Sequence, residues 1–172
     1  MKKSVLLTTS TAVALLASAA FTGQTANAAD SIATAAVAAG SLSISAPTGL
    51  DLGSITPGAA GTGTMAGVEV TDARAATAGW VASVAISDFT SAELGTTIPA
   101  AGASYTPTTA TTTGTVSVTA APATGGSETV VQTATGVSGN NTATWDGTVT
   151  LTVPADALAA DDYTATITHS VA

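Results

Sequence analysis

Apolar and polar residues alternate along three stretches of the chain with a period of two, as a β-strand with one buried face requires. The clearest stretch is Trp80–Ser87, in which Trp80 and every second residue after it are apolar. Thr144–Val153 shows a similar pattern and is stopped by Pro154. Tyr163–Val171 sets four hydroxyl residues opposite a mostly apolar face. Each stretch is therefore predicted to be a strand whose apolar face packs on a core.

Weaker strand patterns and turn signals fill most of the remaining sequence. Five shorter segments are predicted strands: Ser41–Ala46, Leu50–Ile55, Ala103–Thr106, Thr115–Ala120 and Glu128–Ala134. Clusters of Gly, Pro, Ser and Asn predict a hairpin connection at Pro122–Ser127 and a turn at Gly136–Asn141, and Ala155–Asp162 predicts one helical turn. Short alternating strands separated by turns predict an all-β protein, a single-domain antiparallel β-sandwich of the Ig-like, Greek-key type.

The first residues have the pattern of a secretory signal peptide. A basic start precedes an apolar run, and small residues close the segment at Ala28. We expect cleavage after Ala28, so that residues 1–28 are a leader, 29–40 a linker or first strand, and 41–172 the domain. A retained membrane helix is disfavoured, because the uninterrupted apolar run is shorter than the roughly 20 residues that a span needs.

Charge and cysteine content exclude several classes of function. Cleavage would leave Arg74 as the only basic side chain against eleven acids. Binding to nucleic acid or to an anionic membrane surface needs clustered Lys and Arg. The chain has no cysteine, which excludes disulfides, thiolate nucleophiles and cysteine metal sites. We therefore expect no nucleic-acid partner, no membrane span in the mature form and no cofactor.

His169 is the only histidine, so it is the main candidate for acid–base chemistry. Ser170 follows it directly, but neighbours on a strand point to opposite faces and cannot form a nucleophile–base pair there. The sequence also lacks a glycine-flanked nucleophile elbow. We predict that the protein is not an enzyme. A secreted hydrolase is the minor alternative, and it would need His169 or Asp156 in a deep cleft beside a second acid.

The remaining charged groups have structural interpretations. Arg74 is predicted to pair with Asp72 or Asp88, because a guanidinium forks onto a carboxylate. Three acids lie around one turn, and Ca²⁺ prefers several oxygen ligands, but their spacing is not that of an EF-hand loop. A solvated turn is the favoured interpretation and a cation site the open alternative for Asp156, Asp161 and Asp162.

Thr71–Thr90 and Thr144–Ala172 together resemble the two motif regions of the WxL-type cell-surface domain. An acid-x-Arg element, a Gly-Trp pair and an acid-Phe pair match in the first region: Asp72, Arg74, Gly79, Trp80, Asp88 and Phe89. A tryptophan-led strand ending in proline and a Tyr-led last strand match in the second: Trp145, Pro154 and Tyr163. Asn140-Asn141-Thr142 resembles actinobacterial members, and the resemblance runs from Ile44 to the end.

The resemblance implies a secreted protein that attaches non-covalently to the cell wall, with peptidoglycan as its ligand and other surface proteins as further partners. Both name-giving tripeptides are changed, to Trp80-Val81-Ala82 and His169-Ser170-Val171. We expect a wall-contacting patch at Trp80, His169 and Val171. Structural roles are expected for other residues that match the family pattern: Asp72, Arg74, Asp88, Phe89, Trp145 and Tyr163.

A second function stays open beside wall binding. Few charges, many hydroxyl residues and a strand at the C-terminus also fit a structural subunit of a surface layer, fibre or coat. Such a subunit would assemble by strand addition or by packing of sheet faces.

Overall fold

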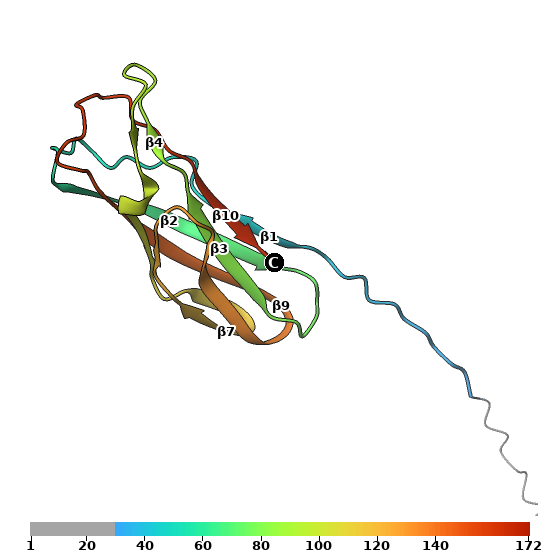
Figure 1. Cartoon of the computed structure of the whole chain (residues 1–172). Helices are drawn as coiled ribbons and strands as arrows, with labels where there is room; N and C mark the ends of the chain where they lie inside the picture. The colour runs from blue at the N-terminus through green and yellow to red at the C-terminus, as the bar shows by residue number, and fades with distance from the viewer. Residues whose placement is uncertain (1–29) are drawn as a thin grey trace, which may run out of the picture. The chain divides into compact units, whose positions relative to one another are not determined.

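The computed structural model describes residues 30–172 (Figure 1). The predicted leader, residues 1–28, lies outside the described residues. The chain divides into two units, Met1–Ala36 and Val37–Ala172. Residues 30–41 form no helix or strand, and every strand belongs to the second unit.

Ten β-strands and one short 3₁₀ helix, η1, make up the second unit. The first five strands are β1 (Leu42–Ser45), β2 (Ala60–Asp72), β3 (Trp80–Ile86), β4 (Phe89–Thr90) and β5 (Thr97–Ile98). After them come η1 (Ala100–Gly102), β6 (Ala103–Pro107), β7 (Thr111–Ala120), β8 (Ala123–Thr124), β9 (Thr129–Thr152) and β10 (Ile167–Val171). All strand pairings are antiparallel, which confirms the predicted all-β, antiparallel, single-domain fold.

Strand β9 organises the main sheet, whose order is β1-β2-β9-β3-β10. Its first part pairs with β3 and its last part with β2 and β6, while β7 pairs with β9 along the middle. β4 and β5 form a separate two-stranded sheet. The main sheet bends along β9 and folds over, so that its two end strands, β1 and β10, lie side by side (Figure 1).

The predicted turn at Gly136–Asn141 is wrong, because this segment lies inside β9. Gly136 and Gly139 have φ angles of 61° and 74°, a left-handed conformation that glycine adopts without steric cost. β7 continues to pair with β9 across this region, with register shifts on both sides of Thr115. The residues that signalled a turn are therefore bulges that bend a continuous strand.

The predicted strand at Leu50–Ile55 is also wrong. This segment packs as irregular chain against the beginning of β2, where two glycines allow a close approach. A Cβ atom at Gly63 would lie 2.7 Å from the carbonyl oxygen of Asp51, and one at Gly61 would collide with the side chain of Ile55. The apolar side chains of the segment thus reach the core without a strand pairing.

The region before the last strand differs from its prediction as well. Ala155–Asp162 forms no helical turn, and the chain reverses there with the N–H of Ala157 donating to the carbonyl of Pro154 over 3.1 Å. β10 is shorter than the predicted strand, which began at Tyr163. Before β10 the chain is held by an isolated bridge between Thr164 and Thr90 and by a hydrogen bond from the N–H of Ser87 to the carbonyl of Thr166.

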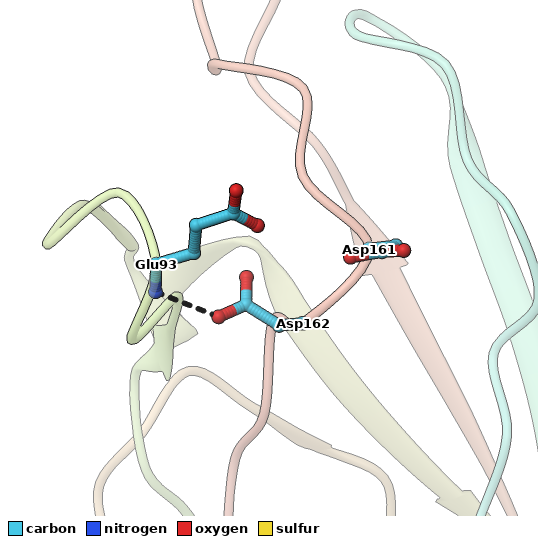
Figure 2. A group of neighbouring side chains, drawn as sticks. All are labelled: Glu93, Asp161 and Asp162. Atoms are coloured by element: carbon cyan, nitrogen blue, oxygen red, sulfur yellow. Dashed lines mark hydrogen bonds between the residues drawn. The ribbon is translucent and has the colours of Figure 1, made fainter.

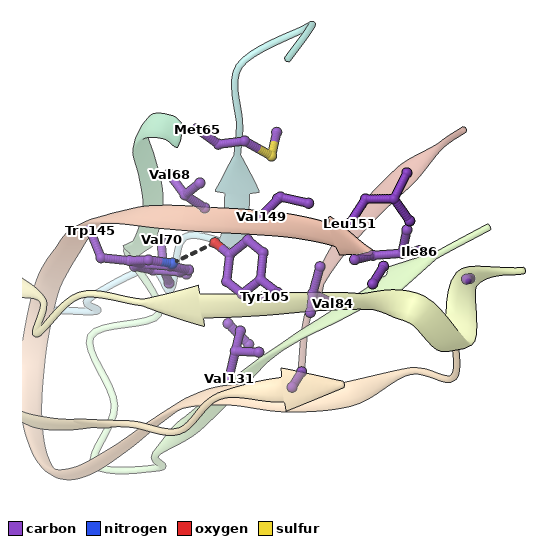
Figure 3. Close-up of a cluster of buried hydrophobic side chains, with 14 of the residues drawn as sticks. Met65, Val68, Val70, Val84, Ile86, Tyr105, Val131, Trp145, Val149 and Leu151 are labelled. Carbon is purple, nitrogen blue, oxygen red and sulfur yellow. Dashed lines mark hydrogen bonds between the residues drawn. The ribbon is translucent and has the colours of Figure 1, made fainter. Parts of the chain in front are cut away.

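The core lies between the folded halves of the sheet (Figure 3). The predicted buried face of β3 is confirmed, since Trp80, Ala82, Val84 and Ile86 are each at most 2% exposed. β2, β6 and β9 complete the core with the fully buried side chains of Val68, Val70, Tyr105, Val131, Trp145 and Val149. Full burial of one such apolar side chain stabilises the fold by about 1.5–3 kcal/mol, so this cluster is the main source of stability.

Candidate functional site

Asp72 and Arg74 form a bidentate ion pair at the end of β2. Nε of Arg74 donates to Oδ1 of Asp72 over 2.9 Å, and Nη2 donates to Oδ2 over 3.0 Å. Arg74 also donates to the carbonyls of Ala78 and Gly79, which lead into β3. Asp72 is 1% exposed, and its hydrogen bonds from Arg74 hold the pKa of this carboxyl below its usual value. The pair therefore fixes the connection between β2 and β3.

Trp80 is joined to this ion pair through Asn141. The indole N–H of Trp80 donates to Oδ1 of Asn141, and Nδ2 of Asn141 donates to Oδ2 of Asp72 over 3.3 Å. Trp80 is 2% exposed and Asn141 3%. A buried amide and a buried indole each need a partner, and here they satisfy each other. The first motif region is thus a buried polar junction of β2, β3 and β9.

A second chain of hydrogen bonds runs through the buried Tyr105 and ends at the partly buried His169. Nε1 of Trp145 donates to the Tyr105 hydroxyl over 3.1 Å (Figure 3), and Nε2 of His169 lies 3.2 Å from the same oxygen. The rings of Tyr105 and His169 meet edge to face, with their centroids 5.4 Å apart. Burial raises the pKa of Tyr105 and lowers that of His169, which keeps both groups neutral near pH 7.

The three residues of the predicted wall patch share the inward face of β3 and β10. His169 pairs in register with Val84, and Val171 pairs with Ala82, two residues after Trp80. Residues directly opposite each other in an antiparallel pair lie on the same face of the sheet. The structure therefore brings the three residues to one face, and that face points toward the core.

The other predicted structural residues lie around the segment that follows β3. Oδ1 of Asp88 accepts a hydrogen bond of 2.7 Å from the backbone N–H of Ala100, the first residue of η1. Phe89 is 7% exposed. The hydroxyl of Tyr163 donates to the carbonyl of Leu158 over 3.0 Å and lies 2.9 Å from Oγ1 of Thr96.

A groove of about 760 Å³ opens between residues 47–57 and residues 157–167. Its floor is apolar and includes the buried side chains of Met65, Phe89 and Leu151. Half-buried Leu50 and Ile167 contribute to its sides. An open groove with an apolar floor can take up the apolar part of a ligand.

Three carboxylates come together beside this groove, and one of them, Asp161, lines it (Figure 2). Glu93, Asp161 and Asp162, here called the acidic cluster, have oxygens within 4.8 Å of one another. Asp162 accepts hydrogen bonds from the hydroxyl of Ser91 and the N–H of Glu93, which lower its pKa. Of the three acids considered for a cation site, Asp161 and Asp162 thus come together with Glu93, and Asp156 is outside the cluster.

Comparison with known families shows to which family the chain belongs. The sequence model of the WxL domain, described as a surface cell wall-binding domain, matches residues 59–172. The chain belongs to the WxL family. The protein is accordingly a cell-wall-binding surface protein, as the sequence resemblance predicted. Comparisons with curated proteins and with solved structures gave no match. In residues 30–172 no helix has the length and apolarity that a membrane crossing needs.

The hydrogen-bonding roles of two central residues of this WxL domain were missed by sequence reasoning. Tyr105 joins Trp145 to His169, and Asn141 joins Trp80 to Asp72. Tyr105 lies in a stretch rich in Thr, Pro and Gly, and Asn141 lies in a segment that resembled a turn. The only available signal was that a buried indole needs a hydrogen-bond acceptor, which does not say which residue supplies it.

Proposed function

We propose that this WxL protein is secreted, is not an enzyme, and associates non-covalently with peptidoglycan. Membership of a cell-wall-binding family is the observation that carries the proposal. Export would depend on the leader at residues 1–28, which lies outside the described residues. The groove and its acidic cluster offer a place for a ligand that has apolar and cationic groups.

The surroundings of His169 support a non-catalytic role. Its ring contacts Tyr105 on the inward face, whereas the hydroxyl of Ser170 donates to Glu128 over 2.6 Å. The histidine and the adjacent serine thus have separate partners and do not form a nucleophile–base pair with each other. A hydrolase assay on wall polymers should therefore show no release of product.

Wall contact by Trp80, His169 and Val171 stays a prediction. Trp80 is 2% exposed, so a polymer could reach its indole only after the core packing around it had opened. The variant His169→Gln keeps a neutral hydrogen-bonding side chain. It tests whether the imidazole contacts the wall or has only a structural role. Loss of wall retention in a folded His169→Gln protein would favour this patch, and unchanged retention would exclude a role for the imidazole.

Sedimentation with isolated cell walls tests the proposed function. The purified chain is mixed with walls, centrifuged and washed, and a tube without walls is the control. We expect the protein in the pellet only when walls are present. Purified peptidoglycan free of other wall polymers should retain it equally well. Retention by whole walls but not by purified peptidoglycan would overturn the choice of ligand.

Strand β7 supports a second candidate function, that of a structural subunit of a surface layer, fibre or coat. Among the described strands β7 pairs only with β9, so its other edge is unpaired, and no charged residue occurs between Glu93 and Glu128. Long edges without charge are open to strand addition. Assembly that rises with concentration in a sizing column, and disappears in Thr119→Lys, would support this function. A monomer at all concentrations would exclude it.

A further inference from the structure

The groove between residues 47–57 and 157–167 has the size of a ligand site. Its volume of about 760 Å³ lies within the range of roughly 300–1,000 Å³ that is typical of ligand pockets. The floor residues Met65, Phe89 and Leu151 are part of the core. A ligand side chain that entered the groove would leave water and contact apolar groups that are already fixed in place.

Acidic groups line the groove and basic groups do not. Asp51 and Asp161 line it, and Glu93 and Asp162 stand within 4.8 Å of Asp161. In residues 30–172 the only Lys or Arg is Arg74, whose guanidinium is bound to Asp72. Carboxylates this close repel one another, so a cationic group of a ligand would both relieve the repulsion and be attracted.

One side of the groove has backbone groups that an extended chain could pair with. Within the described part of the protein, residues 47–52 make no backbone–backbone hydrogen bond. On the opposite side, residues 163–166 are anchored by backbone hydrogen bonds of Thr164 with Thr90 and of Thr166 with Ser87. Peptides are commonly bound through their backbone at an exposed sheet edge, and the unpaired backbone of residues 47–52 offers an extended peptide the same kind of groups.

The surface offers little to hold a sugar ring. Sugars are commonly held against exposed aromatic faces, but Trp80 and Trp145 are each 2% exposed. The exposed large apolar residues of the described chain are all aliphatic: Ile32, Val37, Leu94, Val130 and Leu158. The chemistry of the groove therefore suits a peptide better than a glycan.

We infer that the groove binds the peptide portion of peptidoglycan in an extended conformation. Small apolar side chains of the peptide rest on the floor, and a free ammonium group is held by the acidic cluster. This inference rests on the proposed function, because it names the part of the wall polymer that the protein recognises. The glycan strands serve only as the carrier of the bound peptides.

Sedimentation with two preparations of peptidoglycan tests this inference. One is intact, and in the other an amidase has removed the peptides from the glycan strands. We expect the purified chain to sediment with the first and to stay in the supernatant with the second. Equal sedimentation with both overturns the peptide inference while the proposed function stands. Failure to sediment with intact peptidoglycan overturns the proposed function.

Two substitutions at exposed groove residues locate the site. Asp161→Asn removes one carboxylate, and Leu158→Ser removes an aliphatic side chain that is 58% exposed. We expect Asp161→Asn to weaken binding of the released peptides by about two- to fivefold, as for one partly exposed ion pair, and to make binding less sensitive to salt. Leu158→Ser should weaken binding to a similar degree.

Matched controls lie outside the groove lining. Glu128→Gln removes another exposed carboxylate, and Val130→Ser removes an exposed aliphatic side chain of β9. Circular dichroism should show that all four variants keep the fold. The controls should bind the peptides like the unchanged protein. Unchanged binding in Asp161→Asn and Leu158→Ser as well would overturn the groove as the site.

Discussion

The indole nitrogen of Trp80 donates a hydrogen bond of 3.1 Å to Oδ1 of Asn141, although 61 positions separate the two residues. Asn141 in turn donates to Asp72, which is paired with Arg74. The tryptophan of the first motif region thus belongs to a buried polar network that joins three strands. Its contribution to this domain is structural, whatever else it contacts.

Replacement of Trp80 by Phe should destabilise the fold. The change removes the donor to Asn141 and leaves a buried amide oxygen without its partner, which costs about 1–3 kcal/mol. The smaller ring also leaves part of its buried volume empty, which adds to the loss. Urea denaturation of the two proteins measures the difference. Equal free energies of unfolding would contradict the network.

A double-mutant cycle measures how much the hydrogen bond between Trp80 and Asn141 contributes to the free energy of unfolding. Asn141→Ala should cost clearly less in a Trp80→Phe background than in the unchanged protein, because the shared hydrogen bond is then already absent. Thr119→Ala on exposed β7 is the matched control, and its effect should be the same in both backgrounds. Strict additivity for Trp80 and Asn141 would mean that the contact contributes nothing.

Asp72→Asn should destabilise the protein at neutral pH. Breaking a fully buried ion pair costs about 3–5 kcal/mol, and the loss here should be smaller because the Arg74 side chain is 26% exposed. Asp72 has a lowered pKa in the folded protein, so its contribution is complete above the ordinary aspartate pKa and is lost as the pH falls through the folded value. Urea titrations between neutral and acidic pH should show a shallower acid dependence in Asp72→Asn.

His169 should also make the protein less stable as the pH falls, in a pH range above that of Asp72. Burial lowers its pKa, so below the ordinary histidine pKa the unfolded chain binds the proton more readily than the folded protein. Stability from a neutral imidazole is therefore complete above that ordinary value and is lost as the pH falls below it. His169→Gln, which keeps a partner for Tyr105, should lose this component. An identical dependence of stability on pH in both proteins would contradict the lowered pKa of the partly buried His169.

Ala75→Gly should stabilise the protein. Ala75 has a φ of 53° in the connection between β2 and β3, where a residue with a Cβ atom pays about 1–2 kcal/mol. Glycine removes this strain but gains freedom in the unfolded chain, so the net gain should be below about 1 kcal/mol. Thermal denaturation should show a slightly raised Tm. Ala66→Gly, at an exposed position of β2, is the control and should lower the Tm.

The sequence predicts a strand correctly where the apolar residues of that strand alone mark its buried face. In Trp80–Ile86 every second residue is apolar, and this face is buried as predicted. The prediction failed at Gly136–Asn141 because glycine signals both a turn and a bulge, and only the pairing with β7 decides between them. Leu50–Ile55 failed for a similar reason, since the glycines of β2 that receive it lie elsewhere in the sequence.

The candidate site could be predicted less well than the fold. Trp80 and His169 were identified by type and position, but their partners Asn141 and Tyr105 are distant in sequence. The acidic cluster mixes Asp161 and Asp162 with Glu93, which comes from another loop. Such groupings depend on how the sheet folds over, and no local pattern in the chain encodes them.

Retention by the cell wall is the property that most directly tests the proposed function. Isolated walls, and purified peptidoglycan beside them, are sedimented with the purified chain, and a wall-free tube corrects for protein that sediments alone. We expect the protein in the pellet with both preparations and in the supernatant of the wall-free tube. Protein that stays in the supernatant in all three tubes would contradict the proposed function.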